Sequence, residues 1–355
     1  MSRERRRTVL FLVLPAGVGG SVRSLATVLR HVGVHRAVAM SPSTNTAGFV
    51  EERGLADEVV WCPPSGRLAR ARTAIRLLAW GTRHRATLAA VHANGVSDLH
   101  LVAPLALVSR RPVVVWVHEA RVGGRGLRLF RLWARILPAL HVRYVSEPQM
   151  AAVGVVARRG STGVTPNPID PADVVAPRAG PVGDVPAAGF LGTPATYKGF
   201  HLLPALVAGT GGAVAWHVFA GPRTMLPDTW RALEAIPSVE LHGKVRDVAA
   251  AYAALDIVAC PSLEESFGRV VAEAMSNGLP VVAFALPALA EFVDDGADGV
   301  LVEVGDVAAM SAAIVGLAAD AGLRRSLGER ARRRAEAFAP AAIAASLERL
   351  YVGGA

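Results

Sequence analysis

Cysteine and lysine are almost missing from this chain. Two cysteines among 355 residues cannot build a disulfide framework. One of them, Cys260, falls in an apolar stretch that predicts a buried strand, so we expect no disulfide and favour a reducing compartment. Only two of the 38 basic residues, Lys198 and Lys244, are lysines, and the rest are arginines.

Long apolar runs, repeats and zinc-type spacings are also absent from the sequence. No run reaches the roughly 20 apolar residues that a membrane-spanning helix needs. Cysteine and histidine do not recur at zinc-finger spacing, and we find no internal repeat or heptad array. The composition, 52% hydrophobic and 19% charged, is typical of a globular protein, and the length allows two domains.

The first residues imitate a secretory signal, because a basic stretch precedes a short apolar run. We predict instead that residues 9–14 form the first buried strand of a parallel sheet. A glycine-rich loop and a helical pattern follow this run, and no clear small-residue cleavage site does. The expected location is therefore the cytoplasm, with attachment to the inner face of the plasma membrane as the alternative.

Apolar strands alternate with helical stretches in both halves, which is typical of an α/β fold with mostly parallel sheets. We expect strands at residues 9–14, 37–40, 113–117, 142–145, 188–191, 215–220, 239–242, 256–260 and 281–284. A proline-rich stretch, residues 171–187, predicts a linker. The predicted domains are therefore residues 1–170 and 188–338, and a last helix is expected within residues 339–355.

The most informative run lies between Cys260 and Ala283 and predicts a strand, a loop, a helix, a tight turn and a second strand. The helix should begin close to Glu265, Ser266 and Gly268. Its free N–H groups and positive dipole end would form an anion site.

Two carboxylates frame this predicted anion site, Glu265 and Glu273. Eight residues along a helix span about 12 Å. An extended ligand such as a sugar–diphosphate–ribose could therefore place a hydroxyl on each carboxylate and its phosphates at the helix start. The alternative is that both glutamates are solvated surface residues.

The run resembles the glutamate–seven residues–glutamate motif of GT4-type retaining glycosyltransferases, the "glycosyltransferase group 1" family. Similar motifs in family order occur at residues 9–29, 91–94, 115–119, 144–146, 164–170, 190–199 and 294–302. The resemblance implies the GT-B fold, two Rossmann-like domains with parallel sheets that face each other across a cleft. It also implies that the last helix, within residues 339–355, returns to the first domain.

The resemblance assigns roles to individual residues. It implies that Glu265 and His118 contact the transferred sugar, that Glu273 contacts the ribose, and that Lys198 contacts the diphosphate. The remaining donor-binding candidates lie in the matching loops: Gly19, Gly20, Thr193, Ser266, Phe267 and Gly268. The candidates in loops follow predicted strands, as expected for ligands at the carboxyl edge of an open α/β sheet. No metal or other cofactor is implied, because the nucleotide-diphosphate sugar is a co-substrate.

Two positions depart from the family pattern. Thr193 stands where the family usually has an arginine of the phosphate clamp. Pro287, which has no N–H, stands in the usual Gly-Gly pair. Either another arginine such as Arg223 or Arg269 substitutes, or the donor site is weak or degenerate.

Charge is unevenly distributed, with 24 basic against 9 acidic residues in residues 1–170, a net charge of +15. Two basic amphipathic stretches there, residues 67–85 and 125–137, suit an anionic membrane surface. The alternative is that both are ordinary core helices. No recognition motif favours nucleic acid. The acidic pair Asp294 and Asp295 falls in a predicted turn and is expected to serve it rather than a metal.

We therefore predict a metal-independent retaining glycosyltransferase that moves a sugar from a nucleotide-diphosphate sugar to an acceptor hydroxyl. The acceptor would be a glycan, glycolipid or small molecule, in cell-envelope or polysaccharide synthesis. Two alternatives remain: a tailoring enzyme that acts on a soluble secondary metabolite, and a donor-binding pseudoenzyme with a degenerate diphosphate site.

Overall fold

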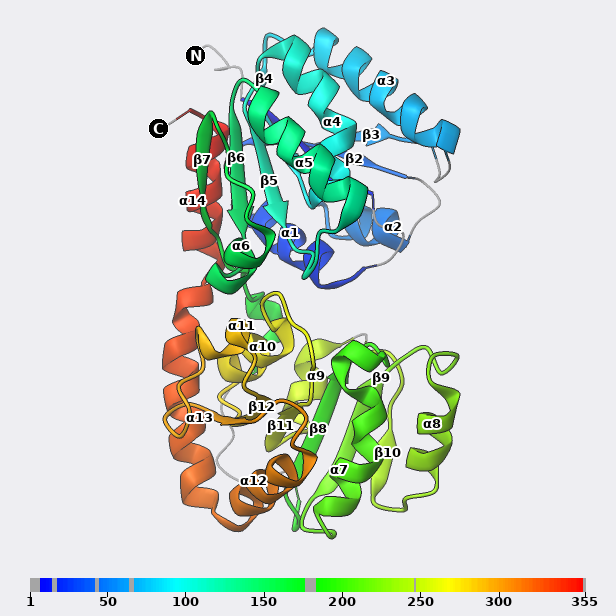
Figure 1. The fold of residues 1–355 in the computed structure, drawn as a ribbon, viewed down its shortest axis with the longest axis vertical. Coiled ribbons are helices and arrows are strands. Elements are labelled where there is room, and N and C mark those ends of the chain that lie inside the picture. The colour runs from blue at the N-terminus through cyan, green and yellow to red at the C-terminus, as the bar shows by residue number, and fades with distance from the viewer. Residues whose placement is uncertain are drawn as a thin grey trace. The chain divides into compact units, whose positions relative to one another are not determined.

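The computed structural model describes residues 7–14, 18–41, 45–63, 67–175, 183–245 and 247–353. The chain divides into two compact units, each with its own sheet (Figure 1). Unit 1 comprises Met1–Pro168 and Pro340–Ala355, and unit 2 comprises Ile169–Ala339.

Unit 1 is built on a seven-stranded parallel sheet of order β3-β2-β1-β4-β5-β6-β7. Its strands are β1 Thr8–Val13, β2 His35–Met40, β3 Glu58–Trp61, β4 Leu88–Ala93, β5 Val113–Val117, β6 Leu140–Tyr144 and β7 Gly160–Val164. Every residue of β1 and β5 is buried, as expected for strands of a parallel sheet that is covered on both faces. The edge strand β7 was not predicted, because its sequence Gly-Ser-Thr-Gly-Val has no apolar run and its residues are not buried.

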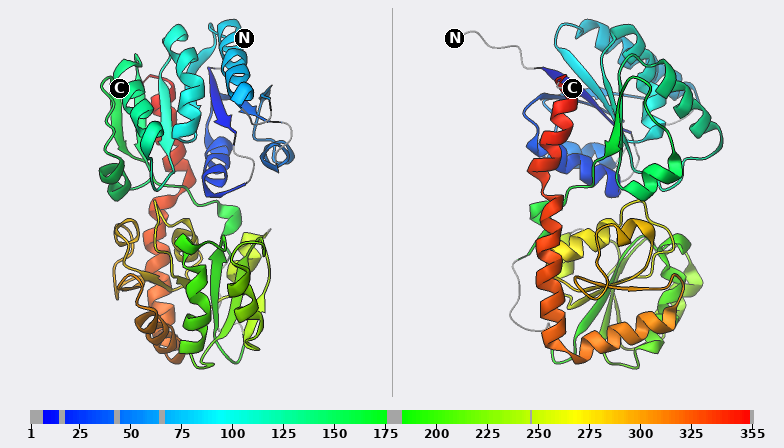
Figure 2. Two further views of the ribbon diagram at one scale, coloured as in Figure 1. Left: turned by 45° about the vertical axis from the view of Figure 1, so that its right-hand side comes forward. Right: turned by 60° about the vertical axis from the view of Figure 1, so that its left-hand side comes forward.

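The helices of unit 1 are α1 Gly20–His31, α2 Asn45–Glu52, α3 Arg67–Arg83, α4 Val96–Ser109, α5 Gly124–Ile136, α6 Glu147–Val153 and α14 Pro340–Tyr351. Helices α3, α4 and α5 lie side by side, and α14 lies against α1 and contacts β4 and β5 (Figures 1 and 2). The C-terminal helix is thus part of unit 1 although about 170 residues of unit 2 intervene.

His92 fastens α14 to the sheet of unit 1. The hydroxyl of Tyr351 and Nδ1 of His92 are hydrogen-bonded at 2.8 Å, and both side chains are buried. Burial lowers the pKa of His92 to about 3, so the imidazole is neutral. His92 is therefore a core residue that contacts α14.

Unit 2 is built on a six-stranded parallel sheet of order β10-β9-β8-β11-β12-β13. Its strands are β8 Ala187–Gly192, β9 Ala215–Ala220, β10 Val239–Leu241, β11 Ile257–Cys260, β12 Val281–Phe284 and β13 Val300–Val302. Its helices are α7 Leu203–Gly209, α8 Pro227–Glu234, α9 Val248–Ala253, α10 Arg269–Ser276, α11 Pro287–Ala290, α12 Val307–Ala319 and α13 Ala321–Ala335, with 3-10 turns η1 Pro171–Asp173, η2 Thr196–Lys198, η3 Phe200–Leu202 and η4 Glu336–Phe338.

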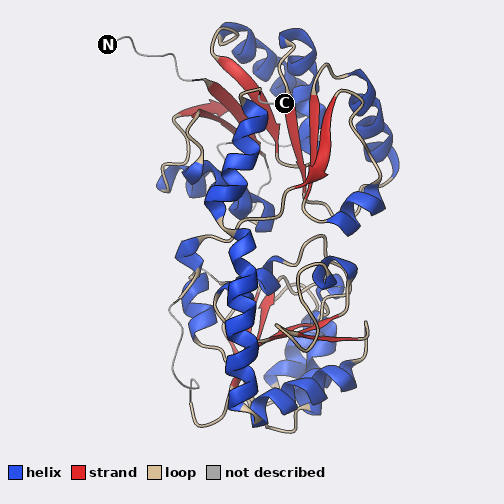
Figure 3. Ribbon diagram, turned by 90° about the vertical axis from the view of Figure 1, so that its left-hand side faces the viewer, coloured by secondary structure: helices blue, strands red, loops and turns tan. Residues whose placement is uncertain are grey.

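Helices cover both faces of this second sheet (Figure 3). Helices α7, α8 and α12 pack over one face, where Trp216 and Val218 of β9 join their apolar side chains. Helix α10 packs on β11, β12 and α13. Because side chains alternate along a strand, His217 and Phe219 of β9 point to the face opposite Trp216 and Val218.

The predicted linker, residues 171–187, overlaps the start of unit 2. Residues 171–173 form η1, and residues 176–182 lie outside the described ranges. Within the described ranges no single helix is both long and apolar enough to cross a membrane. One pair, residues 307–319 with 321–351, meets those criteria only together and is bent by 106°.

Candidate functional site

Two loops of unit 2 bring Lys198 and Glu265 together. Lys198 ends η2, after β8, and Glu265 lies in the loop between β11 and α10. The Lys198 ammonium donates a hydrogen bond to Oε1 of Glu265 at 2.7 Å, and the Ser262 hydroxyl donates to the same oxygen at 2.9 Å. The side chain of Glu265 is only 8% exposed and that of Lys198 is 24% exposed. Two predicted catalytic residues, 67 positions apart, thus form one ion pair at the carboxyl edge of the sheet.

Gly199 explains why these two loops can approach so closely. Its φ is +69°, and a Cβ there would lie 1.9 Å from the carbonyl oxygen of Pro261. The carbonyl of Tyr197 also accepts hydrogen bonds from the backbone N–H groups of Leu263 and Glu264, at 2.8 and 3.3 Å. Backbone contact between the loops therefore determines where Lys198 lies relative to Glu265.

The charge of Lys198 is well suited to an anionic ligand. Burial lowers the pKa of its ammonium, but the attraction and hydrogen bond of Glu265 outweigh burial, so the pKa is raised overall. Lys198 therefore carries its charge at neutral pH. Nearby, burial raises the pKa of Cys260 to about 11, which leaves this thiol protonated and a poor nucleophile.

Helix α10 begins directly after this loop, as predicted. Its N-cap is Gly268 at φ +91°, and no side chain caps the helix. The glycine is required, because a Cβ would lie 2.1 Å from Cδ2 of Leu289. Phe267 is 3% exposed, and its ring packs against Phe292 and Phe338 at 5.2 Å. Its side chain therefore belongs to the core of unit 2.

Glu273, the predicted ribose carboxylate, is 5% exposed and already has partners. It accepts hydrogen bonds from the Tyr252 hydroxyl at 2.9 Å and from Nε of Arg269 at 2.6 Å. Nη2 of Arg269 also lies 3.7 Å from a carboxylate oxygen of Asp173. Arg269 is therefore held by acidic side chains rather than placed as a substitute for the missing clamp arginine.

The two departures from the family pattern, Thr193 and Pro287, are exposed, and the second proposed substitute, Arg223, is already paired. Arg223 forms an ion pair with Glu234, and its guanidinium lies 5.3 Å from the centre of the Trp230 ring. Since both proposed substitutes are engaged elsewhere, Lys198 is the basic residue that the described structure places beside Glu265.

In unit 1, Asn94 connects three segments. Its Oδ1 is hydrogen-bonded to Nε2 of His118 at 2.9 Å, and its Nδ2 donates to the carbonyl of Ser21 at 3.3 Å. The ends of β4 and β5 therefore meet the start of α1, where the predicted Gly19 and Gly20 are exposed. A Cβ at Gly19 would meet nothing within 4 Å, and Gly17 lies outside the described residues.

Two acidic residues lie beside His118. Glu119 accepts hydrogen bonds from the N–H groups of Val96 and His118, at 2.9 and 3.2 Å, and so stabilises the start of α4. Asp98, in the first turn of α4, is 6% exposed, and its Oδ2 has no hydrogen-bond partner among the described residues. Burial and, to a lesser degree, the charge of Glu119 raise the pKa of Asp98 to about 7.

Some functional candidates were missed because only the fold brings them to the site. Ser262, Tyr252 and Asp98 contact or neighbour the predicted residues, yet nothing in their local sequence indicates this. The acidic pair Asp294 and Asp295, after α11, takes part in turn hydrogen bonds, as predicted. Oδ1 of Asp295 accepts from the N–H of Leu301 at 2.9 Å, and Oδ1 of Asp298 accepts from the N–H of Asp294 at 2.7 Å.

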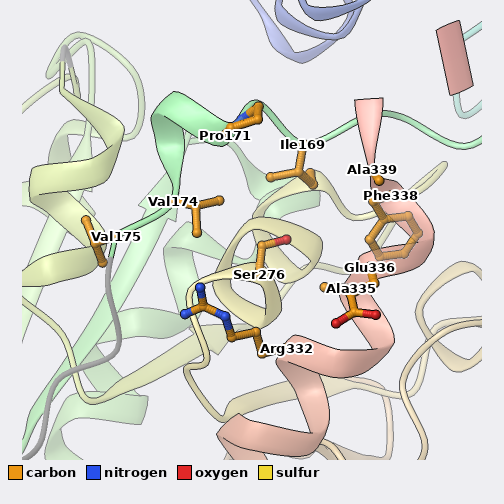
Figure 4. A pocket seen from close by; sticks show the side chains of 10 residues that line it. All are labelled: Ile169, Pro171, Val174, Val175, Ser276, Arg332, Ala335, Glu336, Phe338 and Ala339. Atoms are coloured by element: carbon orange, nitrogen blue, oxygen red, sulfur yellow. The ribbon is translucent and has the colours of Figure 1, made fainter. Parts of the chain in front are cut away.

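Unit 2 also contains a cavity of about 450 Å³ away from these residues. It lies between the segment Ile169–Val175 and the end of α13 with η4. Figure 4 shows Arg332 and Glu336 on its walls beside the apolar Val174 and Phe338. It shares no residue with the Lys198–Glu265 site.

The comparisons with known proteins all match glycosyltransferases. Residues 186–320 match the family model described as "Glycosyl transferases group 1". The chain is 29% identical to the phosphatidyl-myo-inositol mannosyltransferase of Mycolicibacterium smegmatis, over 95% of this chain and 90% of that protein. It is 42% identical over 105 residues to the D-inositol 3-phosphate glycosyltransferase of Corynebacterium kroppenstedtii, but this match spans 30% of the chain and only 23% of that relative.

Solved structures agree on the fold. The Anabaena protein HepE, solved in complex with UDP and glucose, superposes with a TM-score of 0.81 at 22% identity, over 96% of this chain and 98% of HepE. The sucrose-phosphate synthase of Thermosynechococcus elongatus superposes with a TM-score of 0.78 at 20% identity, over 98% of both chains. With two parallel α/β sheets, these matches show the GT-B fold.

Proposed function

We propose that this chain is a retaining glycosyltransferase that uses a nucleoside-diphosphate sugar. The proposal starts from its membership of the group 1 glycosyltransferases and its GT-B fold. The observation that carries the proposal is the Lys198–Glu265 ion pair, which backbone contact at Gly199 places at the carboxyl edge of the second sheet. This pair supplies a cation for the diphosphate and a carboxylate for sugar hydroxyls.

In the proposed reaction, the bond between the sugar C1 and the diphosphate oxygen breaks, and the diphosphate leaves with the electron pair. The charged Lys198 and the uncapped start of α10 stabilise the negative charge that develops on it. When the donor phosphates bind Lys198 in place of Glu265, the Glu265 carboxylate accepts hydrogen bonds from sugar hydroxyls.

The acceptor oxygen then attacks C1 from the face that the diphosphate leaves, and a donor phosphate oxygen takes the acceptor proton. His118 contacts the donor sugar. Glu273 accepts from the ribose hydroxyls in exchange for one of its present partners. No step in this scheme requires a metal ion.

A thermal-shift screen with UDP, GDP, ADP and dTDP, each with and without a sugar, tests the donor assignment. We expect one nucleotide to raise the unfolding midpoint, because a ligand that binds only the native state stabilises it. UDP and UDP-glucose are the first choices, since HepE was solved with UDP and glucose. Lys198→Met should reduce the shift. A shift without sugar transfer or donor hydrolysis would favour the pseudoenzyme, and no shift at all would contradict a working donor site.

For the acceptor, we propose an envelope glycolipid or glycan, with a soluble metabolite as the second candidate. The names of two relatives specify an inositol phosphate and a phosphatidyl-inositol acceptor. Residues 1–170 carry the net charge of +15 that would attract such anionic groups.

Helix α5 is the surface that we propose to contact an anionic membrane. Three apolar side chains at helical spacing, Leu129, Leu132 and Ile136, are 42–46% exposed. Exposed arginines flank them: Arg125, Arg128, Arg131 and Arg135. Exposed leucines beside arginines suit a helix that lies in the interface of an anionic bilayer.

Co-sedimentation with phosphatidylglycerol vesicles at low salt checks this surface. We expect the wild-type protein to pellet with these vesicles, to remain in solution with phosphatidylcholine vesicles, and to be released by salt. The triple variant Leu129→Ser, Leu132→Ser, Ile136→Ser should no longer pellet. Val304→Ser with Leu323→Ser, at 45% and 42% exposed positions of unit 2, is the control and should behave as wild type. Equal sedimentation of both variants would contradict α5 as the contact.

A further inference from the structure

Three potential metal ligands meet at the edge of the second sheet, outside the residues assigned above. His217 lies in β9, Glu240 in the edge strand β10, and His242 directly after β10 (Figure 1). In the parallel register Glu240 pairs with His217. His242 is two residues beyond Glu240, so the alternation of side chains places it on the same face.

The three ligand atoms form a small triangle. Nδ1 of His217 lies 2.9 Å from Nε2 of His242 and 3.3 Å from Oε2 of Glu240, and Nε2 of His242 lies 3.8 Å from Oε2 of Glu240. A point about 2 Å from all three atoms exists at the centre of such a triangle, and this distance is the usual Zn–N and Zn–O bond length.

Packing holds the two imidazoles in place before any ion arrives. The rings of His217 and His242 are nearly parallel, with an interplanar angle of 8° and centroids 5.2 Å apart, and the His242 ring stacks on Phe219 at 4.3 Å. Phe219 is itself buried.

We propose that His217, Glu240 and His242 form a binding site for a zinc-type dication. Two imidazoles and one carboxylate are a donor set that first-row transition metals prefer over Mg²⁺ or Ca²⁺. In the metal-bound state each imidazole is neutral and offers one lone pair, so the proton now shared by Nδ1 of His217 and Nε2 of His242 is carried instead on the ring nitrogen that does not face the ion. The fourth ligand is water, because the side chain of Glu240 is 66% exposed and the site is open to solvent.

The site is separate from the donor chemistry proposed above. None of its residues belongs to the Lys198–Glu265 loops, and it joins the edge strand β10 to β9. A bound ion would therefore stabilise the sheet edge of unit 2, and its presence can be measured without any assay of sugar transfer.

Calorimetric titration of the tag-free, full-length protein with Zn²⁺, and visible absorption with Co²⁺, test the site. We expect one ion per chain, and no comparable binding of Mg²⁺ or Ca²⁺. Loss of even an outer-shell partner costs about 10- to 100-fold in metal affinity, so His242→Ala and His217→Ala should each weaken Zn²⁺ binding at least this much. His201→Ala, an exposed histidine of the same unit, is the matched control and should bind as wild type.

Glu240→Gln keeps the inference testable if His217→Ala fails to fold, because its side chain is mostly exposed and nearly the same size. It should weaken Zn²⁺ binding and leave the unfolding midpoint of the metal-free protein unchanged. The inference is overturned if the wild type binds no stoichiometric Zn²⁺, or if the cluster variants bind it as tightly as His201→Ala does.

Discussion

Lys198→Met is expected to lower kcat by about 100- to 1000-fold, the usual effect of removing one group that stabilises developing negative charge. Glu265→Gln, which has the shape but not the charge of glutamate, should lower kcat to a similar extent. The reason is that, in the proposed reaction, Lys198 contacts the leaving diphosphate and Glu265 contacts the sugar hydroxyls. Initial rates at saturating donor, with folding checked by circular dichroism, provide the measurement.

The double variant Lys198→Met, Glu265→Gln separates catalysis from a structural ion pair. Either single change leaves one partner of a largely buried pair, so both single variants should be less stable than wild type. The double variant removes both charges and should recover part of this stability without recovering turnover. Recovery of turnover together with stability would show that the pair has only a structural role.

A second ion pair supplies a control for this experiment. Arg36 and Asp57 in unit 1 interact at 2.9 Å, with side chains that are 20% and 32% exposed. The hydrogen bond from Arg36 lowers the pKa of Asp57 to about 2. Arg36→Met with Asp57→Asn should leave kcat unchanged, because both residues lie at the amino ends of β2 and β3, at the edge of the sheet opposite the carboxyl ends.

Much of the fold could be predicted because its signals are local. Buried strands such as β1 and β5 are continuous apolar runs, and the turn after α10 contains Gly278 and Pro280. The edge strands β3 and β7 were not among the predicted strands. In β3 only Val60 is buried, and in β7 no residue is, so neither strand is a continuous run of buried apolar residues. Their pairing with neighbouring strands, rather than their own composition, makes them strands.

The sequence indicated which residues belong to the candidate site, but not the contacts that these residues make. The resemblance indicated Lys198, Glu265 and Glu273, and the rule that ligands lie at strand carboxyl ends indicated their common edge. It did not indicate that Glu273 is buried between Tyr252 and Arg269, because hydrogen bonds across distant segments leave no local pattern. The cluster of His217, Glu240 and His242 was missed for the same reason, since a spacing of 23 positions between His217 and Glu240 resembles no zinc motif.

Among substitutions of a glycine by alanine in the proposed site, Gly199→Ala is expected to cause the largest loss of both stability and activity. The new Cβ would lie 1.9 Å from the Pro261 carbonyl oxygen, which belongs to backbone that cannot move away without separating the two loops. The left-handed conformation costs a non-glycine residue about 1–2 kcal/mol. Overpacking adds about 1–3 kcal/mol. The expected loss is therefore about 3 kcal/mol in the free energy of unfolding.

Gly211→Ala separates these two contributions. Gly211 also has a positive φ, +56°, but a Cβ there would meet nothing within 4 Å. It should therefore show the conformational cost alone, and kcat should stay at the wild-type value. Urea unfolding and initial rates measured on both variants make the comparison. Because Gly199 fixes the distance between Lys198 and Glu265, Gly199→Ala should also lower kcat in the protein that remains folded. Equal effects of the two substitutions would mean that contact between the loops does not determine the geometry of the site.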